Sequence, residues 1–134
     1  YMQIRMPKEV ALHIHKNGDE KQVEVNSELI AWVLENLIKN SIDAIRGKGT
    51  ITIDMSWEST AIVTVQDTGS GMSKKLQKTI FNPGITTKKR GWGLGLSLAK
   101  RIVEQYHGGK LRLAESSEKG STFEIQLPLK QKYS

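Results

Sequence analysis

Apolar residues recur with helical spacing between Ser27 and about Arg46, and this long amphipathic segment is the strongest constraint on the fold. The apolar positions return every three or four residues, which places them along one face of a helix: Ile30, Val33, Leu34, Leu37, Ile38, Ile42 and Ile45. Asn26 or Ser27 is expected to cap the start of this helix, and Gly47 to end it. The segments on either side of the helix indicate what its apolar face packs against.

The segments around this helix alternate apolar and polar residues, which is typical of half-buried strands. The predicted strands are residues 10–18, 21–26, 50–57, 61–67, 110–116 and 121–129. The first two are expected to pair around the turn residues Asn17 and Gly18, and the next two to form a hairpin. A sheet with a helix packed on it follows from this pattern.

Two further helices are predicted after the hairpin, from Lys74 to Ile80 and from Leu94 to Tyr106. The second carries apolar residues at i, i+4 spacing and ends at a pair of glycines: Leu94, Leu98, Ile102, Tyr106, then Gly108 and Gly109. Between them, residues 82–93 contain glycines and a proline and are expected to form a mobile loop. The order ββαββααββ predicts an α+β fold, a two-layer α/β sandwich with helices packed on one face of a mixed, mostly antiparallel sheet.

Length and composition fit a single globular domain over residues 1–134. The chain is 37% hydrophobic and 25% charged, and no apolar run approaches the roughly 18 residues of a membrane span. It has no cysteine, which excludes disulfides and thiolate metal sites and favours a cytoplasmic location. The start at Tyr1 without a leader indicates a fragment of a longer chain.

The formal charge of +6 is concentrated in one part of the sequence. No acidic residue occurs between Asp67 and Glu104, where the basic residues are Lys74, Lys75, Lys78, Lys88, Lys89, Arg90, Lys100 and Arg101. A solvated basic face and a phosphate-facing surface both explain this window. A nucleic-acid binder would interleave aromatic residues with the basic ones, and only Phe81 and Trp92 fall here, so no nucleic-acid partner is expected.

Three polar residues lie on one flank of the long helix. At about 100° per residue, Asn36, Asn40 and Asp43 fall within roughly 60° of one another. Asparagine is a poor residue for a helix interior, so two on one flank require a reason. They are either satisfied polar residues at the core boundary or neutral oxygen ligands for a hard cation such as Mg2+, which also bridges to phosphates.

Asp67 to Met72, with the sequence DTGSGM, follows a predicted strand directly. A carboxylate there can only accept hydrogen bonds, which suits an exocyclic amino group, while Gly69 and Gly71 let the backbone approach a flat ligand. Ordinary turn chemistry explains the same residues.

Glycines alternate in KKRGWGLGLSLAK, from Lys88 to Lys100, directly before a predicted helix. Gly91, Gly93 and Gly95 free backbone N–H groups to surround an anion, and the helix N-terminus adds further donors. The stretch predicts a phosphate-binding loop that is neither a Walker loop nor a dinucleotide fingerprint.

Together these motifs resemble the ATP-binding catalytic domain of sensor histidine kinases, a Bergerat-fold (GHKL) domain with the short lid of the nitrogen-regulation type. The resemblance runs from Val10 to Leu129, with four motifs in the family's order and a matching closing strand, GSTFEIQLP. The motifs are ENLIKNSIDAI (N box), DTGSGM (first glycine box), IFNPGITTKK (F box) and GWGLGLSLAKRIVEQYHGG (second glycine box).

The resemblance implies a role for each matched residue. Asn40 would coordinate the Mg2+ of ATP, with Asn36 on the same phosphate side, and Asp67 would accept from the adenine amino group. Asn36, Asn40 and Lys88 are the implied catalytic residues. The remaining nucleotide-binding residues are Asp43, Gly69, Gly71, Met72, Phe81, Thr86, Thr87, Gly91, Gly93, Leu94, Gly95 and Leu96.

Two positions depart from the family pattern, and two rival functions share the fold. Asp43 replaces a common basic residue, and Trp92 replaces a small residue or threonine. ATPases of this fold place a glutamate one turn before the metal asparagine as general base, but that position is Asn36 here, while Glu35 points roughly 140° from Asn40 at about 100° per residue. A kinase is therefore favoured over an ATPase, and an anti-sigma-factor-type serine kinase remains an alternative.

The resemblance also implies partners that this sequence does not contain. His13 and His15 alternate in a predicted strand, unlike a phosphoacceptor on a helix, so the acceptor histidine is expected upstream on a dimerisation domain. The isolated domain is expected to be monomeric and unable to autophosphorylate, and the full-length protein to be a homodimer that serves a response regulator. The location would be cytoplasmic, or the cytoplasmic portion of a membrane-anchored sensor.

Overall fold

The computed structural model of the chain describes residues 6–83 and 95–130. Its elements in chain order are β1 (Val10–Asn17), α1 (Ser27–Ala44), β2 (Gly49–Trp57), β3 (Thr60–Asp67), α2 (Lys74–Thr79), α3 (Gly95–Arg101), the π-helical turn η1 (Ile102–Tyr106), β4 (Lys110–Ser117) and β5 (Gly120–Pro128). No helix in these two stretches is long and apolar enough to cross a membrane. Most of the loop expected at 82–93 lies outside the described residues.

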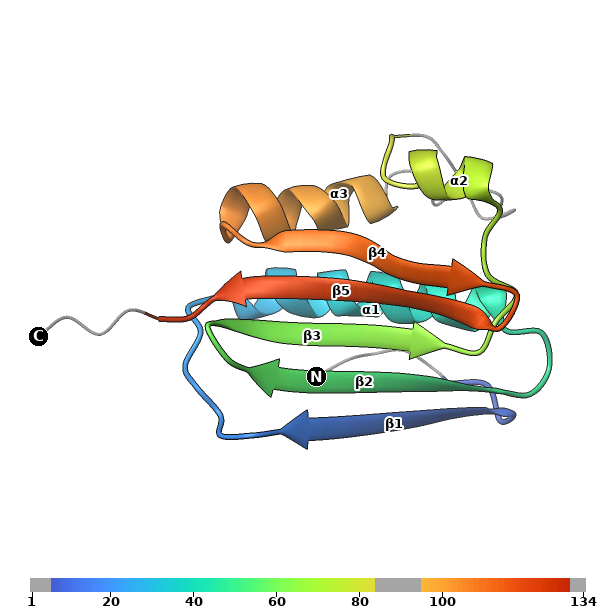
Figure 1. Ribbon diagram of the computed structural model, residues 1–134, viewed down its shortest axis with the longest axis horizontal. Coiled ribbons are helices and arrows are strands. Elements are labelled where there is room, and N and C mark those ends of the chain that lie inside the picture. Colours follow the sequence, from blue (N-terminus) through green and yellow to red (C-terminus); the bar gives the residue numbers. More distant parts are fainter. Residues whose placement is uncertain (1–5, 84–94, 131–134) are drawn as a thin grey trace, which may run out of the picture.

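The strands form one five-stranded sheet in the order β1-β2-β3-β5-β4 (Figure 1). β1 pairs with β2 in parallel, and the other neighbouring pairs are antiparallel. α1 lies across one face of this sheet, and α3 lies beside β4. The predicted mixed, mostly antiparallel sheet with helices on one face is confirmed.

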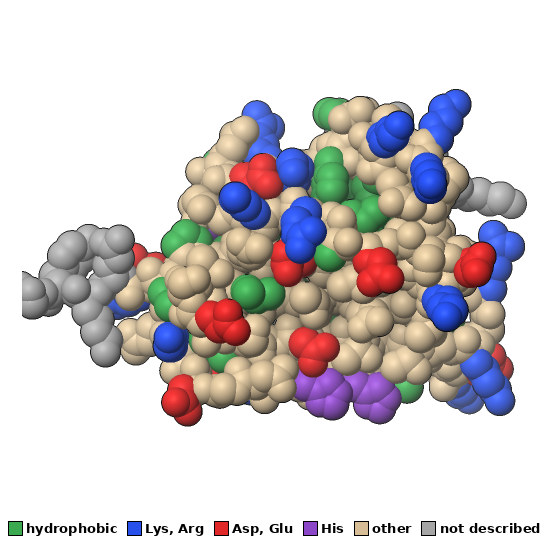
Figure 2. All heavy atoms as spheres, in the orientation of Figure 1, with side chains coloured by type: hydrophobic (Ala, Val, Ile, Leu, Met, Phe, Trp, Pro, Cys, Tyr) green, Lys and Arg blue, Asp and Glu red, His purple; other side chains and the backbone are tan. Residues whose placement is uncertain are grey.

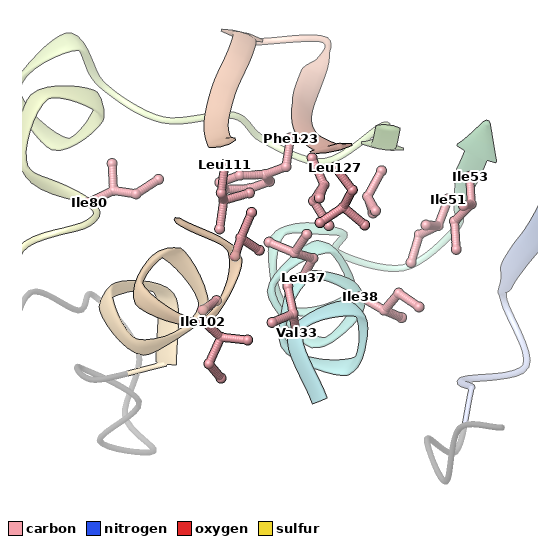
Figure 3. Close-up of a cluster of buried hydrophobic side chains, with 14 of the residues drawn as sticks. Val33, Leu37, Ile38, Ile51, Ile53, Ile80, Ile102, Leu111, Phe123 and Leu127 are labelled. Atoms are coloured by element: carbon pink, nitrogen blue, oxygen red, sulfur yellow. The ribbon is translucent and has the colours of Figure 1, made fainter. Parts of the chain in front are cut away.

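The hydrophobic core lies between this sheet face and the helices. Figure 3 shows side chains from α1, from η1 and from the strands converging on it, including Val33, Leu37, Ile102, Leu111 and Phe123. Each of these five side chains is at most 3% exposed. The apolar stripe predicted for α1 is thus the face that holds the two layers together, because apolar burial is the main favourable term in folding.

α1 begins and ends close to the predicted residues. The Asn26 side chain caps it by accepting a hydrogen bond from Leu29 N at 3.1 Å, as expected for an N-cap asparagine. The helix ends at Ala44, and Gly47 adopts a φ of +87°, a left-handed conformation that favours glycine. The chain then turns directly into β2.

The predicted pairing of residues 10–18 with 21–26 is wrong. β1 pairs with β2 instead, and residues 21–26 contribute only an isolated bridge between Val23 and Leu129. Parallel neighbours require a crossover connection, and α1 supplies it between β1 and β2. The alternation at 21–26 reflects one core contact, by Val23, while Val25 is 37% exposed. The order is therefore β-α-β-β-α-α-β-β.

The described part of the helix predicted from Leu94 to Tyr106 begins at Gly95, and of the described residues in the predicted apolar row it buries Ile102 but not Leu98 or Tyr106. Leu98 and Tyr106 are 39% and 63% exposed, whereas Ala99, Ile102 and Val103 are at most 3% exposed. The turn η1 is π-helical, so it rotates the last residues away from the regular i, i+4 row. Gly108, with φ +66°, ends the helix as predicted.

Candidate functional site

Asp67 is the last residue of β3 and is almost fully buried, at 3% exposure. Its Oδ1 accepts hydrogen bonds from Gly69 N at 2.9 Å and from Ser121 N at 3.2 Å. Both of these bonds go to the same carboxylate oxygen, which fixes the carboxylate, and within residues 6–83 and 95–130 no hydrogen bond to Oδ2 occurs, so Oδ2 can accept from a ligand. A buried carboxylate with one oxygen held by the backbone is a selective acceptor for an amino group.

Three glycines allow the backbone to close around this carboxylate. A Cβ on Gly69 would lie 2.7 Å from Ala44 Cβ at the end of α1, and a Cβ on Gly120 would collide with the Asp67 carbonyl oxygen. Gly71 has a φ of +75°, and a Cβ there would collide with the Ser117 carbonyl oxygen. Any larger residue at these positions would displace the loop, so the glycines serve close approach as well as turning.

The polar flank of α1 runs from the core to the surface. Asn36 is 5% exposed, Asn40 is half-buried and Asp43 is exposed. Asn36 Nδ2 donates to Trp32 O at 2.9 Å, so its amide is oriented by its own helix. The Asn36 amide is thus held by its own helix through Nδ2, whereas Asn40 is a half-buried residue farther along the same flank.

The start of α3 lies directly against this flank. A Cβ on Gly95 would lie 2.8 Å from Asn36 Oδ1, closer than real Cβ contacts come. A side chain at position 95 would therefore force the Asn36 side chain to move if α3 is to stay this close to α1. The contact brings the end of the glycine-rich segment next to the predicted phosphate side.

Met72 and Phe81 follow the Asp67 turn along the chain. Met72 N donates to Ser116 Oγ at 2.9 Å, and Met72 also packs on the core. Phe81 makes an edge-to-face contact with Phe123, with 6.2 Å between the ring centroids. Lys100 Nζ lies 4.8 Å from the Phe81 centroid, a cation–π contact that joins Phe81 to α3.

A separate pocket of about 500 Å³ lies beside Phe81, between the segment that follows α2 and the residues of α3 and η1. Its lining contains neither Asp67 nor Asn40, so it is distinct from the Asp67 turn. The residues that line it are Phe81, Pro83, Ser97, Leu98, Lys100, Arg101, Glu104 and Gln105. Lys100 is already engaged there, since its Nζ lies 3.2 Å from Glu104 Oε2 and donates to Leu111 O.

The structure therefore describes part of the predicted site. Asp67, Gly69 and Gly71 form the turn, Asn36 and Gly95 are in contact, and Leu96 packs against the core. The remaining predicted residues lie outside the described stretches: Thr86, Thr87, Lys88, Gly91, Gly93 and Leu94.

Sequence reasoning missed the serines that support the turn. Ser121 N holds Asp67, and Ser121 Oγ lies 2.8 Å from Ser116 Oγ, which in turn accepts from Met72 N. The one sequence signal for the close approach of this segment to Asp67 was Gly120, directly before a predicted strand. Ser41 was missed too: its hydroxyl is buried and has no hydrogen-bond partner in the described structure.

A model of a known protein family matches most of this sequence. The model for "Histidine kinase-, DNA gyrase B-, and HSP90-like ATPase" matches residues 25–131, which include the Asp67 turn and the polar flank of α1. The chain belongs to this ATPase family.

Relatives within the ATPase family are sensor and sporulation kinases. The chain is 37% identical over 124 residues to the sensor histidine kinase ZraS of Salmonella typhi, and the aligned region covers 91% of this chain and 26% of ZraS. It is 39% identical over 115 residues to sporulation kinase C of Bacillus subtilis, covering 85% of the chain and 25% of that protein. The chain thus spans about a quarter of the length of these relatives.

A solved structure confirms the Bergerat fold for this member of the ATPase family. The catalytic domain of histidine kinase ThkA in a nucleotide-free form superposes with a TM-score of 0.80 at 33% identity, covering 90% of this chain and 79% of that one. ThkA in complex with the response regulator protein TrrA matches with a TM-score of 0.76 at 30% identity, covering 90% of this chain and 34% of that one.

Proposed function

We propose that the chain is the ATP-binding catalytic domain of a two-component sensor histidine kinase. It would bind Mg-ATP, whose γ-phosphate would be transferred to a histidine on an upstream dimerisation domain. The observation that carries this proposal is the carboxylate of Asp67, which is buried with one oxygen fixed by two backbone N–H groups. Family membership and the kinase relatives support it.

The residues around Asp67 fit the base of ATP. Oδ2 would accept from the adenine amino group, and a guanine, which carries an oxygen at that position, would be rejected because two acceptors would face each other. Gly69 and Gly71 keep the turn free of side chains that would fill the space of the base. Met72 and Phe81 would supply apolar contact at its edge.

The flank of α1 fits the phosphate end. The half-buried amide of Asn40 would supply an oxygen ligand to Mg2+, which prefers hard oxygen donors and keeps several waters. No group of three or more His, Asp or Glu side chains within residues 6–83 and 95–130 could hold a metal, so phosphate oxygens and water would complete the shell. Asn36 and Gly95 would keep the phosphate side narrow, and Asp43 would act through water or the metal.

The same flank argues against rapid hydrolysis. A general base for water must lie within reach of the nucleophile and be able to take a proton. The residue one turn before Asn40 is Asn36, an amide committed to Trp32 O, which cannot take a proton. Transfer to a protein side chain therefore fits this chain better than an ATPase reaction.

The remaining roles follow the family pattern. Lys88, Thr86 and Thr87 would contact the phosphates, with Gly91, Gly93, Leu94 and Leu96 shaping the phosphate loop. The partners would be the dimerisation domain that carries the acceptor histidine and, through it, a response regulator. The domain would act in the cytoplasm, and the whole protein as a homodimer.

Two measurements on different samples test this function. The 134-residue chain should bind an ATP analogue but release phosphate from ATP negligibly, while the full-length protein should form an acid-labile phosphohistidine with ATP. Asn40→Ala in the full-length protein should abolish that product. Rapid phosphate release by the 134-residue chain would instead support an ATPase, and an acid-stable phosphoserine would support a serine kinase.

A further inference from the structure

Two histidines stand next to each other on β1, away from the proposed nucleotide site. The rings of His13 and His15 lie with their centroids 6.5 Å apart and their planes within 14° of parallel. Both side chains are exposed. Side chains at i and i+2 of a strand point to the same face, so the backbone of β1 holds both imidazoles on one side.

The histidine pair lies on the sheet face turned away from α1. Its neighbours in β2 are Thr52 beside His13 and Asp54 beside His15, whereas the alternate β2 residues, Ile51 and Ile53, are buried. Figure 2 shows two histidine side chains (purple) side by side at the margin of this face. β1 is an edge strand, so no strand of the sheet covers its other side.

The third histidine of the chain is chemically unlike this pair. His107 Nδ1 lies 2.8 Å from Ile102 O, and His107 Nε2 accepts from Asn26 N at 3.0 Å, so both ring nitrogens are occupied. No hydrogen bond to a ring nitrogen of His13 or His15 occurs in the described structure. Those nitrogens face water and can act as ligands.

We infer that His13 and His15 form a two-ligand site for a borderline divalent transition metal ion of the Ni2+, Cu2+ or Zn2+ class. Neutral imidazole suits these ions, and each nitrogen would lie about 2.0–2.1 Å from the metal. The rings reach this arrangement by rotation of exposed side chains, with no change in the backbone. Water fills the other positions.

The charges around the pair favour a cation. Among the described strands β1 pairs with β2, which places the charged residue Asp54 beside His15. Lys16, the basic residue next to His15, lies on the opposite face of the strand, and its Nζ forms an ion pair with Glu20 Oε1 at 3.0 Å. Mg2+ would not compete, because it prefers oxygen ligands, so this site is chemically distinct from the one proposed at Asn40.

Calorimetric titration of the 134-residue chain with NiCl2, in a non-chelating buffer containing excess Mg2+, tests this site. We expect one Ni2+ per chain and weaker binding at acidic pH, where protons compete for the ligands. Replacing a residue that only hydrogen-bonds to a metal ligand already lowers metal affinity by about 10–100-fold. Loss of a ligand itself should cost no less, so His13→Ala and His15→Ala should each weaken Ni2+ binding at least about tenfold. Thr52→Ala, on the same face, should leave the affinity unchanged.

Thermal unfolding gives a second readout. Because a ligand that binds the folded state stabilises it, Ni2+ should raise the unfolding midpoint of the parent but not of the double variant His13→Ala/His15→Ala. Circular dichroism checks that both chains fold. The site is refuted if the double variant binds Ni2+ as tightly as the parent, if either single variant keeps the parental affinity, or if the parent binds no ion.

Discussion

Gly95→Ala offers a sharp test of how α3 is held against α1. The φ of Gly95 lies outside the left-handed region, so the backbone itself accepts alanine. Taken alone, the change would stabilise the protein by about 0.4–1 kcal/mol, because alanine restricts the unfolded chain. The new Cβ, however, would lie 2.8 Å from Asn36 Oδ1, and Asn36 would have to move.

Moving Asn36 has a cost that the structure makes explicit. Its side chain is 5% exposed and is tied to Trp32 O at 2.9 Å. Leaving a buried amide without its partner costs about 1–3 kcal/mol. We therefore expect Gly95→Ala to destabilise the chain by about 1 kcal/mol after the gain above is subtracted.

Urea unfolding of four chains measures this coupling: the parent, Gly95→Ala, Asn36→Ala and the double variant. In the Asn36→Ala background the clash is absent, so Gly95→Ala should become stabilising by about 0.4–1 kcal/mol. The sign change corresponds to a coupling of about 2 kcal/mol, within the range for residues in contact. If the two effects add within about 0.5 kcal/mol, the contact does not hold α3 in place.

Three further outcomes follow from particular residues. Ser41→Ala should raise the free energy of unfolding by about 1 kcal/mol, since it removes a buried hydroxyl that has no hydrogen-bond partner among the described residues; a loss of stability would show that the hydroxyl binds a buried water. The hydrogen bond from Arg112 Nε holds the pKa of Glu124 below its ordinary value of about 4.3. The parent should therefore have a higher free energy of unfolding than Arg112→Met above a pH of about 4.3, where the Glu124 carboxylate is ionised in both the folded and the unfolded chain. This difference should disappear as the pH falls through the lowered pKa of Glu124 in the folded chain. A difference that persists at still lower pH would contradict this assignment. Asn40→Ala should remove most of the Mg2+ dependence of ATP affinity and spare adenosine binding, so calorimetry showing equal Mg2+ dependence would exclude Asn40 as a ligand.

The parts of the fold that the sequence predicted are those with a strong local period. The apolar face of α1 and the hairpin of β2 and β3 follow from side-chain spacing alone, and both are confirmed. β1 pairs with β2 across the α1 crossover, and the spacing of apolar residues within a strand does not indicate which strand will be its neighbour. Residues 21–26 alternate like a strand because Val23 reaches the core, but the segment serves as the connection to α1.

The candidate site shows the same division. The order of the motifs, through the family resemblance, pointed to Asp67, and the two asparagines on one flank of a helix pointed to α1, because asparagine is unusual in a helix interior. The backbone donor at Ser121, which fixes the Asp67 carboxylate, comes from a strand 54 residues later, and no local pattern encodes such a distant contact. The apolar i, i+4 row predicted after Leu94 describes the buried face of this helix only in part: Ile102 is buried, whereas Leu98 in α3 and Tyr106 in the π-helical turn η1 are exposed.

Calorimetric titration with a non-hydrolysable ATP analogue, comparing the parent with Asp67→Asn, tests the central claim most directly. Asparagine Oδ1 can still accept from Gly69 N and Ser121 N, so the fold should survive, but its Nδ2 would face the adenine amino group with a second donor. We expect the binding free energy to weaken by about 1–3 kcal/mol, roughly a 5-fold to 150-fold loss of affinity. Asp19→Asn, at an exposed carboxylate beyond the far end of β1, is the matched control and should bind as the parent does. If Asp67→Asn binds the analogue as tightly as the parent, with an unchanged circular dichroism spectrum, the nucleotide base does not bind at Asp67.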